Sequence, residues 1–201
     1  LNITGGSSGI DTISTAPTII NNIVNSAGAD IITLNTGVDT ITLATADRVG
    51  VNVITAFTAG TDSFTVTGLT AGTASAATAL AAAAAVVTTA NRKDFLQILT
   101  TDGSAASITT SGTATLAVAD MTAATLTNVA AFIAEKFTGN SSATNADNGV
   151  YVINLNHASD ATKSYIYSFD NNTTADVTQA AELALVGIVT TADLANTDFT
   201  V

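Results

Sequence analysis

The chain contains no cysteine, no tryptophan, one proline and one histidine. The absence of cysteine excludes disulfides, thiolate catalysis and structural zinc sites of the cysteine type. The single histidine, His157, has no second histidine with which to form a histidine-based metal site, and a catalytic triad around it would lack obvious partners. We therefore expect His157 to be an ordinary residue of a surface loop.

Positive charge is also scarce, with five Lys and Arg residues against sixteen Asp and Glu residues and a net charge of −11. This balance argues against nucleic acid and anionic lipid as partners, because both require a basic surface. Only Glu135 and Glu182 are glutamates, so a carboxylate pair for glycoside chemistry is not expected. The acidic balance is compatible with hard cations, which prefer carboxylate and carbonyl oxygens.

Long hydrophobic runs are missing as well. Residues 80–87 are apolar but fall short of the roughly 20 residues that a membrane-spanning helix needs, so no membrane span is predicted. The start at Leu1, with neither an initiator Met nor a signal-peptide pattern, indicates a fragment of a longer protein. Val201 is expected to be the natural C-terminus.

A short repeat occupies the first third of the chain. Gly-x-Asp occurs at Gly9 to Asp11, Gly28 to Asp30, Gly37 to Asp39 and Gly60 to Asp62. After the Asp, polar and apolar residues alternate, as in Thr-Ile-Thr-Leu at 40–43, which is typical of a half-buried strand. The glycines are nineteen, nine and twenty-three residues apart, so the repeat becomes irregular toward its end.

Such a repeat predicts a parallel β-roll, in which a turn and a short strand make half a coil and two halves return the chain above itself. Glycine permits the backbone of the turn, and the Asp projects beside carbonyl groups of the turn one coil away. The stacked turns then form an oxygen cage for Ca²⁺. The predicted metal ligands are Gly9, Asp11, Gly28, Asp30, Gly37, Asp39, Gly60 and Asp62. The alternative is a set of ordinary Asp/Gly turns that bind no ion.

These residues resemble the RTX repeat family, whose consensus is Gly-Gly-x-Gly-x-Asp-x-apolar-x. The resemblance covers roughly residues 5–66. The leading glycine pair is mostly missing, and the turn expected near Asn21 and Asn22 has lost its Gly-x-Asp. The resemblance therefore implies a degenerate roll that binds about one to three calcium ions.

The whole chain is predicted to be mainly β, with a short parallel β-roll or β-helix over residues 1–70 and a β-rich C-terminal domain over 71–201 with one or two helices. Apolar spacing predicts a helix over 121–137, and Ala-rich composition favours another within 74–90. A strand is predicted at 95–99 and one or two more within 107–118. Alternation predicts a hairpin of 150–155 with 164–169, then strands at 182–189 and 197–201.

A polar loop between Asp170 and Asp176, followed by Glu182, carries oxygen-bearing side chains at alternate positions, as an EF-hand loop does. It lacks the glycine at the sixth position, and its glutamate comes one residue late. A polar hairpin turn and a looser calcium site both fit this pattern.

The last residues, Asp198 to Val201, resemble the ending of proteins exported by type I secretion. The tail from Tyr151, with Leu-Val-Gly-Ile-Val at 185–189, resembles the closing domain of RTX-type surface-layer proteins and adhesins. The resemblance implies a non-enzymatic, extracellular module at the bacterial cell surface that folds on calcium. It also implies three partners: the type I secretion apparatus, further copies in a lattice, and cell-surface polysaccharide. The alternatives are the export tail of a secreted RTX-type lipase or protease and, less favoured, a carbohydrate-binding β-domain.

Overall fold

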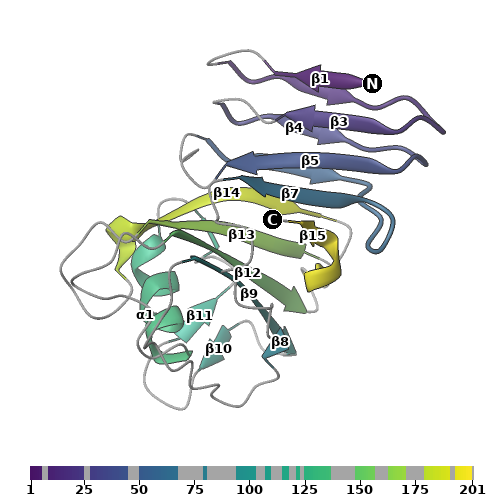
Figure 1. The fold of residues 1–201 in the computed structure, drawn as a ribbon. Helices are drawn as coiled ribbons and strands as arrows, with labels where there is room; N and C mark the ends of the chain where they lie inside the picture. The colour runs from purple at the N-terminus through teal and green to yellow at the C-terminus, as the bar shows by residue number, and fades with distance from the viewer. Residues whose placement is uncertain are drawn as a thin grey trace.

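The computed structural model describes residues 1–5, 9–24, 28–44, 50–67, 79–80, 94–102, 107–109, 115–117, 121–122, 125–136, 148–156, 163–170, 179–190 and 193–200. The described part is mainly β, as predicted. A five-stranded parallel sheet lies at the N-terminal side, and an eight-stranded mixed sheet runs through the rest of the molecule (Figure 1). One short α-helix, a separate two-stranded sheet and two 3₁₀ turns complete the elements of these residues.

The N-terminal third is a parallel β-roll. One of its walls contains β1 (Asn2–Thr4), β3 (Asn21–Val24), β5 (Asp39–Ala44) and β7 (Ser63–Thr67). The other wall contains β2 (Thr12–Ser14), β4 (Ile31–Thr33) and β6 (Asn52–Thr55). The chain alternates between the walls, so the nine-residue step of the repeat is half a coil.

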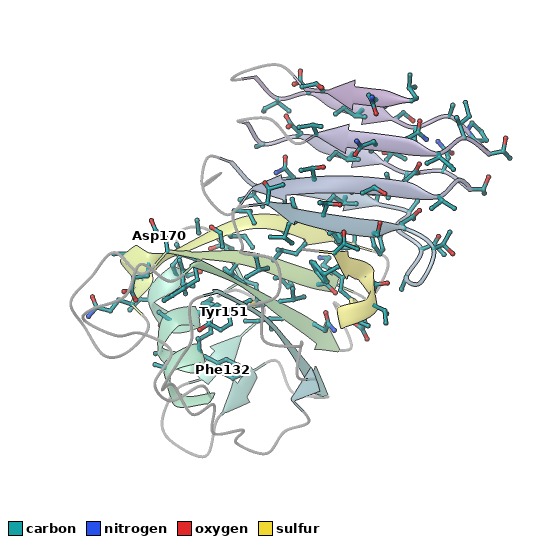
Figure 2. All side chains as sticks on the ribbon, in the orientation of Figure 1. Phe132, Tyr151 and Asp170 are labelled. Carbon is teal, nitrogen blue, oxygen red and sulfur yellow. The ribbon has the colours of Figure 1, made fainter. Side chains whose placement is uncertain are left out.

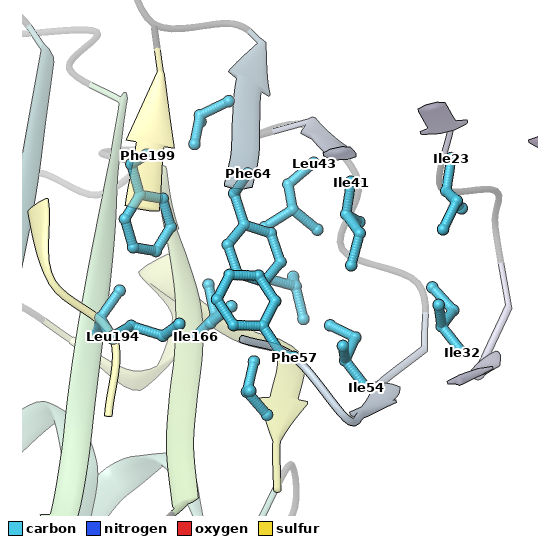
Figure 3. Packing of buried hydrophobic residues seen from close by; sticks show 14 of the residues in the cluster. Ile23, Ile32, Ile41, Leu43, Ile54, Phe57, Phe64, Ile166, Leu194 and Phe199 are labelled. Carbon is cyan, nitrogen blue, oxygen red and sulfur yellow. The ribbon is translucent and has the colours of Figure 1, made fainter. Parts of the chain in front are cut away.

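Apolar side chains form two columns inside the roll, because residues in register on parallel strands point to the same face. The first column is Ile3, Ile23, Ile41, Phe64 and Phe199. The second is Ile13, Ile32, Ile54 and Val189. Apart from Ile3, which is partly buried, all of these side chains are buried (Figure 3). The alternation of Thr with Ile or Leu in the sequence thus corresponds to an inward apolar column in each wall.

The C-terminal domain continues the second wall of the roll. Its strands follow in the order β14 (Leu183–Val189), β13 (Lys163–Asp170), β12 (Asn148–Asn156), β9 (Asp94–Asp102) and β8 (Ala79–Leu80). β12 and β13 form the predicted antiparallel hairpin, and β9 contains the predicted strand at 95–99. β10 (Ser107–Thr109) and β11 (Thr115–Ala117) pair as a small hairpin within the stretch where short strands were predicted.

Alternate residues of the hairpin face two different cores. Val150 and Val152 of β12 belong to the core of the roll, whereas Tyr151 and Ile153 belong to a second core beside α1 (Leu126–Lys136). Tyr151 and Phe132 of α1 are both fully buried in this second core (Figure 2). This two-sided burial explains why every residue from 164 to 169 is buried.

The two predicted domains share both sheets. β14 pairs in parallel with β6, and β15 (Phe199–Thr200) pairs in parallel with β7. The predicted boundary at residue 70 therefore separates two stretches of sequence whose strands hydrogen-bond to each other.

Several element boundaries differ slightly from the predictions. Glu182 lies in a 3₁₀ turn, η2 (Ala180–Glu182), so the strand predicted at 182–189 begins at Leu183. The strand predicted at 197–201 is preceded by η3 (Asn196–Asp198). Most of the Ala-rich segment 74–90, His157 and residues 171–178 lie outside the described residues. No helix in the described part is long and apolar enough to span a bilayer.

Candidate functional site

The predicted aspartate ligands fall into two columns, one on each side of the roll. Asp11 and Asp30 directly precede β2 and β4, and Asn52 takes the equivalent place at the start of β6. Asn21 and Asp39 begin β3 and β5, and Asp62 directly precedes β7. Successive Gly-x-Asp units half a coil apart therefore lie on opposite walls, and residues one coil apart lie in the same column.

The column of Asn21, Asp39 and Asp62 is held together by hydrogen bonds that its carboxylate oxygens accept. Asp39 Oδ1 accepts bonds from the main-chain N–H of Asn21 (3.2 Å) and from its Nδ2 (2.8 Å), and Asp39 Oδ2 accepts one from the Thr15 hydroxyl (3.1 Å). Asp62 Oδ1 accepts a bond from the N–H of Asp39 (2.9 Å), and its Oδ2 accepts one from the N–H of Thr58 (2.8 Å). Each carboxylate thus binds the main chain of the coil before it.

In the column of Asp11, Asp30 and Asn52, side-chain oxygens likewise accept hydrogen bonds from the coil before. Asp30 Oδ1 accepts a hydrogen bond from the N–H of Asp11 (2.9 Å), and Asn52 Oδ1 accepts one from the N–H of Asp30 (3.1 Å). Asn52 Nδ2 donates to the carbonyl oxygen of Val186 on β14 (3.0 Å). This last bond ties the column to the C-terminal domain.

Asp198 ends the column of Asn21, Asp39 and Asp62 at the C-terminal side of the roll. Its Oδ1 accepts a bond from the N–H of Gly60 (2.7 Å), and its Oδ2 accepts one from the N–H of Ala195 (2.8 Å). The resemblance of the last residues places Asp198 only in the secretion-type ending and does not connect it with the roll. A signal was present, because the sequence Phe-Thr-Val follows both aspartates, one residue after Asp62 and directly after Asp198.

The glycines of the repeat allow neighbouring turns to approach closely. A Cβ atom at Gly28 would collide with the carbonyl oxygen of Gly9, and a Cβ at Gly50 would collide with that of Gly28. A Cβ at Gly37 would meet the carbonyl oxygen of Ile19 in the same way. Gly60 instead has a φ of +76°, a conformation that favours glycine.

The carboxylates of Asp39 and Asp62, two of the predicted calcium ligands, have hydrogen-bond partners within the roll. Both side chains are at most 2% exposed, and both oxygens of each accept hydrogen bonds from N–H or O–H groups. These groups point partial positive charge at the oxygens, whereas Ca²⁺ requires six to eight oxygens with lone pairs directed at it. Among the described residues, no group of three or more His, Cys, Asp or Glu side chains could hold a metal. Calcium binding by this chain therefore stays a prediction.

Burial raises the pKa of Asp62, and the nearby carboxylates of Asp39 and Asp198 add to this effect. The N–H groups of Thr58 and Asp39 act in the opposite direction, because they stabilise the ionised form. The column is therefore a row of buried acids in which amide donors offset a part of the desolvation and repulsion.

The raised pKa gives a pH dependence with a defined sign. A folded-state pKa above the unfolded value of about 3.9 means that the folded protein binds more protons between these two values. The contribution of Asp62 to the free energy of unfolding should therefore rise as the pH falls through its folded pKa, and level off below about 3.9. We expect the stability difference between the unaltered chain and Asp62→Asn to shift in favour of the unaltered chain between pH 7 and pH 4 in urea titrations. A difference that is independent of pH would contradict this assignment.

Three further buried polar residues of the described part, Glu182, Asn154 and Ser164, bind the main chain. Glu182 is fully buried and accepts a hydrogen bond from the main-chain N–H of Gln179 (2.8 Å), so its carboxylate stabilises η2. Asn154 and Ser164 of the hairpin are buried and bind the main chain at Leu194. These contacts are structural, and they hold the segment before β15 against the sheet.

No family model, curated protein or solved structure matches this chain. The likeness to RTX and surface-layer proteins therefore depends on the residues quoted above.

Proposed function

We propose that this chain is a structural module of a bacterial surface-layer protein, located outside the cell, and that it is not an enzyme. The observation that carries this proposal is the closure of the roll by the end of the chain. β14 and β15 extend both walls, and Asp198 ends the aspartate column. An open roll end leaves unpaired strand edges, which are prone to aggregate. A module that closes its own roll at this end is suited to a structural, lattice-forming role.

The order of folding follows from this closure. β7 and β15 are separated by more than 130 residues, and the hydrogen bond from Gly60 to Asp198 spans 138. The C-terminal side of the roll is therefore complete only when the last residues are in place. If export proceeds C-terminus first, the closing strands leave the cell before the coils that they close.

The internal hydrogen bonds affect how calcium enters the proposal. The described aspartates already hold neighbouring coils together through main-chain N–H groups, so the proposed structural role requires no ion at Asp39 or Asp62. Calcium binding stays a proposal, and the comparison of millimolar calcium with EGTA tests it.

Negative-stain electron microscopy of the purified chain tests this function, with samples in millimolar calcium and in EGTA. We expect ordered sheets or extended arrays in at least one of these conditions, because a lattice module must self-associate. Arrays only with calcium would support the predicted calcium dependence, and arrays in both would assign assembly to the protein alone. Monodisperse particles in both conditions would contradict the lattice role and favour the export tail of a secreted enzyme.

A further inference from the structure

The N-terminal end of the roll presents two uncovered strand edges. β1 and β2 are the terminal strands of their respective sheets, and both belong to the first coil, at the end of the roll away from the C-terminal domain (Figure 1). Neither strand contains a charged residue or proline, the features by which proteins usually block a sheet edge. Asp11 is the only charged side chain among residues 1–29, although the chain carries a net charge of −11. We call β1, β2, Gly9 and Asp11 the end face.

Gly9 has no structural reason to be glycine within the described part of this chain. Its equivalents one and two coils later, Gly28 and Gly50, each pack against the carbonyl oxygen of the preceding coil. Gly9 has no described atom within 4 Å of the position of a Cβ, and its φ is not in the positive range. A carbonyl group from a further coil above Gly9 would explain this glycine as it explains the other two.

Asn21 lacks a hydrogen-bond donor from the coil before it, unlike Asp39 and Asp62 in the same column. Asp39 Oδ1 and Asp62 Oδ1 each accept a main-chain N–H from the coil before, but Asn21 Oδ1 is buried and has no hydrogen-bond partner. The residue in register above Asn21 is Leu1, because Asn2 pairs with Asn22. The terminal amine of Leu1 donates instead to the carbonyl oxygen of Ile20 (2.8 Å). A peptide N–H at Leu1 would supply the missing donor.

Exposed apolar side chains are concentrated near the same end. The large hydrophobic residues of the described part that are most exposed are Ile10 (72%), Ile20 (67%) and Leu1 (66%). All of the exposed large hydrophobics in this part precede residue 39. A partner that covers this end would therefore also remove apolar surface from water.

From these observations we infer that the end face binds a further parallel β-coil of the Gly-x-Asp type, running in the same direction as the coils below it. The polarity of the columns selects this occupant, because acceptors in each coil face donors in the coil before. A second copy turned head to head would place acceptors against acceptors. A second copy stacked head to tail would have to offer the C-terminal end of its roll. That end is already covered by β14 and β15.

The register defines an exact test. A second copy of residues 20–38, joined to Leu1 by a peptide bond, places Leu1 after Val38 as Asp39 is in the native chain. It also sets the copied Gly28 nineteen residues before Gly9, the native spacing of Gly9 and Gly28. We expect this extended chain to melt at least about 3 °C higher than the 201-residue chain. An extension of the same composition in scrambled order should give no such gain.

Gly9→Ala separates stacking from other effects of the extension. In the 201-residue chain it should change the melting temperature by no more than about 1 °C, because the Cβ enters open space. In the extended chain it should remove most of the gain, because the Cβ would meet the added carbonyl group. No gain from the native-order extension, or an equal effect of Gly9→Ala in both chains, would overturn the inference.

Sedimentation of the 201-residue chain tests whether a second copy of the chain covers the end face. A dimer that Thr4→Lys, at an exposed position of β1, dissociates would assign the end face to a second copy and would also overturn the inference. The comparison of native-order with scrambled extensions reports on the added coil alone, so its failure is distinguishable from a failure to form arrays.

Discussion

Asp39→Ala is expected to lower the free energy of unfolding by about 2–5 kcal/mol. The Asp39 carboxylate accepts hydrogen bonds from the N–H and Nδ2 of Asn21 and from the Thr15 hydroxyl, in a site with no exposed surface. Alanine removes these acceptors and leaves buried donors unsatisfied, at about 1–3 kcal/mol for each. The loss of charge repulsion with Asp62 offsets a part of this cost.

Urea unfolding monitored by circular dichroism measures the effect. Asp193→Ala is the matched control, because Asp193 is exposed, and we expect it to change the free energy by no more than about 0.5 kcal/mol. Equal, small effects of both variants would show that the buried column does not hold the coils together.

The same variant separates the two roles considered for Asp39. If its oxygens bind amide N–H groups, the loss in Asp39→Ala should be the same in EGTA and in millimolar calcium. If they bind calcium, the unaltered chain should lose stability in EGTA, because the ion stabilises only the folded state. The gap between the two chains would then shrink in EGTA, which would support the predicted calcium site.

Local periodicity in the sequence is sufficient to predict much of this fold. The Gly-x-Asp spacing and the alternation after Asp39 predict the parallel roll, because both reflect contacts that recur in every coil. The hairpin of β12 and β13 and the helix α1 follow from patterns within single segments. Such features depend on neighbours in the sequence, so they can be recognised without knowledge of the tertiary structure.

The contents of the aspartate columns could not be predicted in the same way. A Gly-x-Asp pattern places a carboxylate at a turn, but it does not determine whether the oxygens face an ion or an N–H group. That choice depends on the exact stacking of two coils. Asn21 and Asn52 occupy Asp positions in the columns, so the Gly-x-Asp pattern does not include them, although Gly50 precedes Asn52 as the repeat glycine precedes Asp.

The closure of the roll could not be predicted from the periodicity of the sequence either. Asp198 and Phe199 contact residues near Gly60 and Phe64, and no short-range pattern connects segments so far apart. The resemblance of the last four residues to a secretion ending drew attention to an export role. The structure adds a packing role for two of these residues.

Phe199→Ala is expected to lower the free energy of unfolding by about 3–5 kcal/mol, the range for a buried Phe truncated to Ala. The Phe199 side chain is 8% exposed and stacks on Phe64, with ring centroids 5.2 Å apart and an interplanar angle of 21°. Phe64 in turn stacks on Phe57, with centroids 5.0 Å apart (Figure 3). The variant should therefore loosen the roll as well as the C-terminal strand.

A double-mutant cycle with Phe64→Ala tests this coupling directly. We expect the two losses to be non-additive by about 0.5–1.5 kcal/mol, because each ring is a part of the other's packing surface. Thr200→Ala is the control from the same strand, since its exposed side chain bonds the Thr65 hydroxyl and should contribute about 1 kcal/mol or less. If Phe199→Ala were as mild as Thr200→Ala, the end of the chain would contribute little to the roll, and its residues would be explained by export alone. A large, coupled loss would show that the residues resembling a secretion ending also complete the folded core.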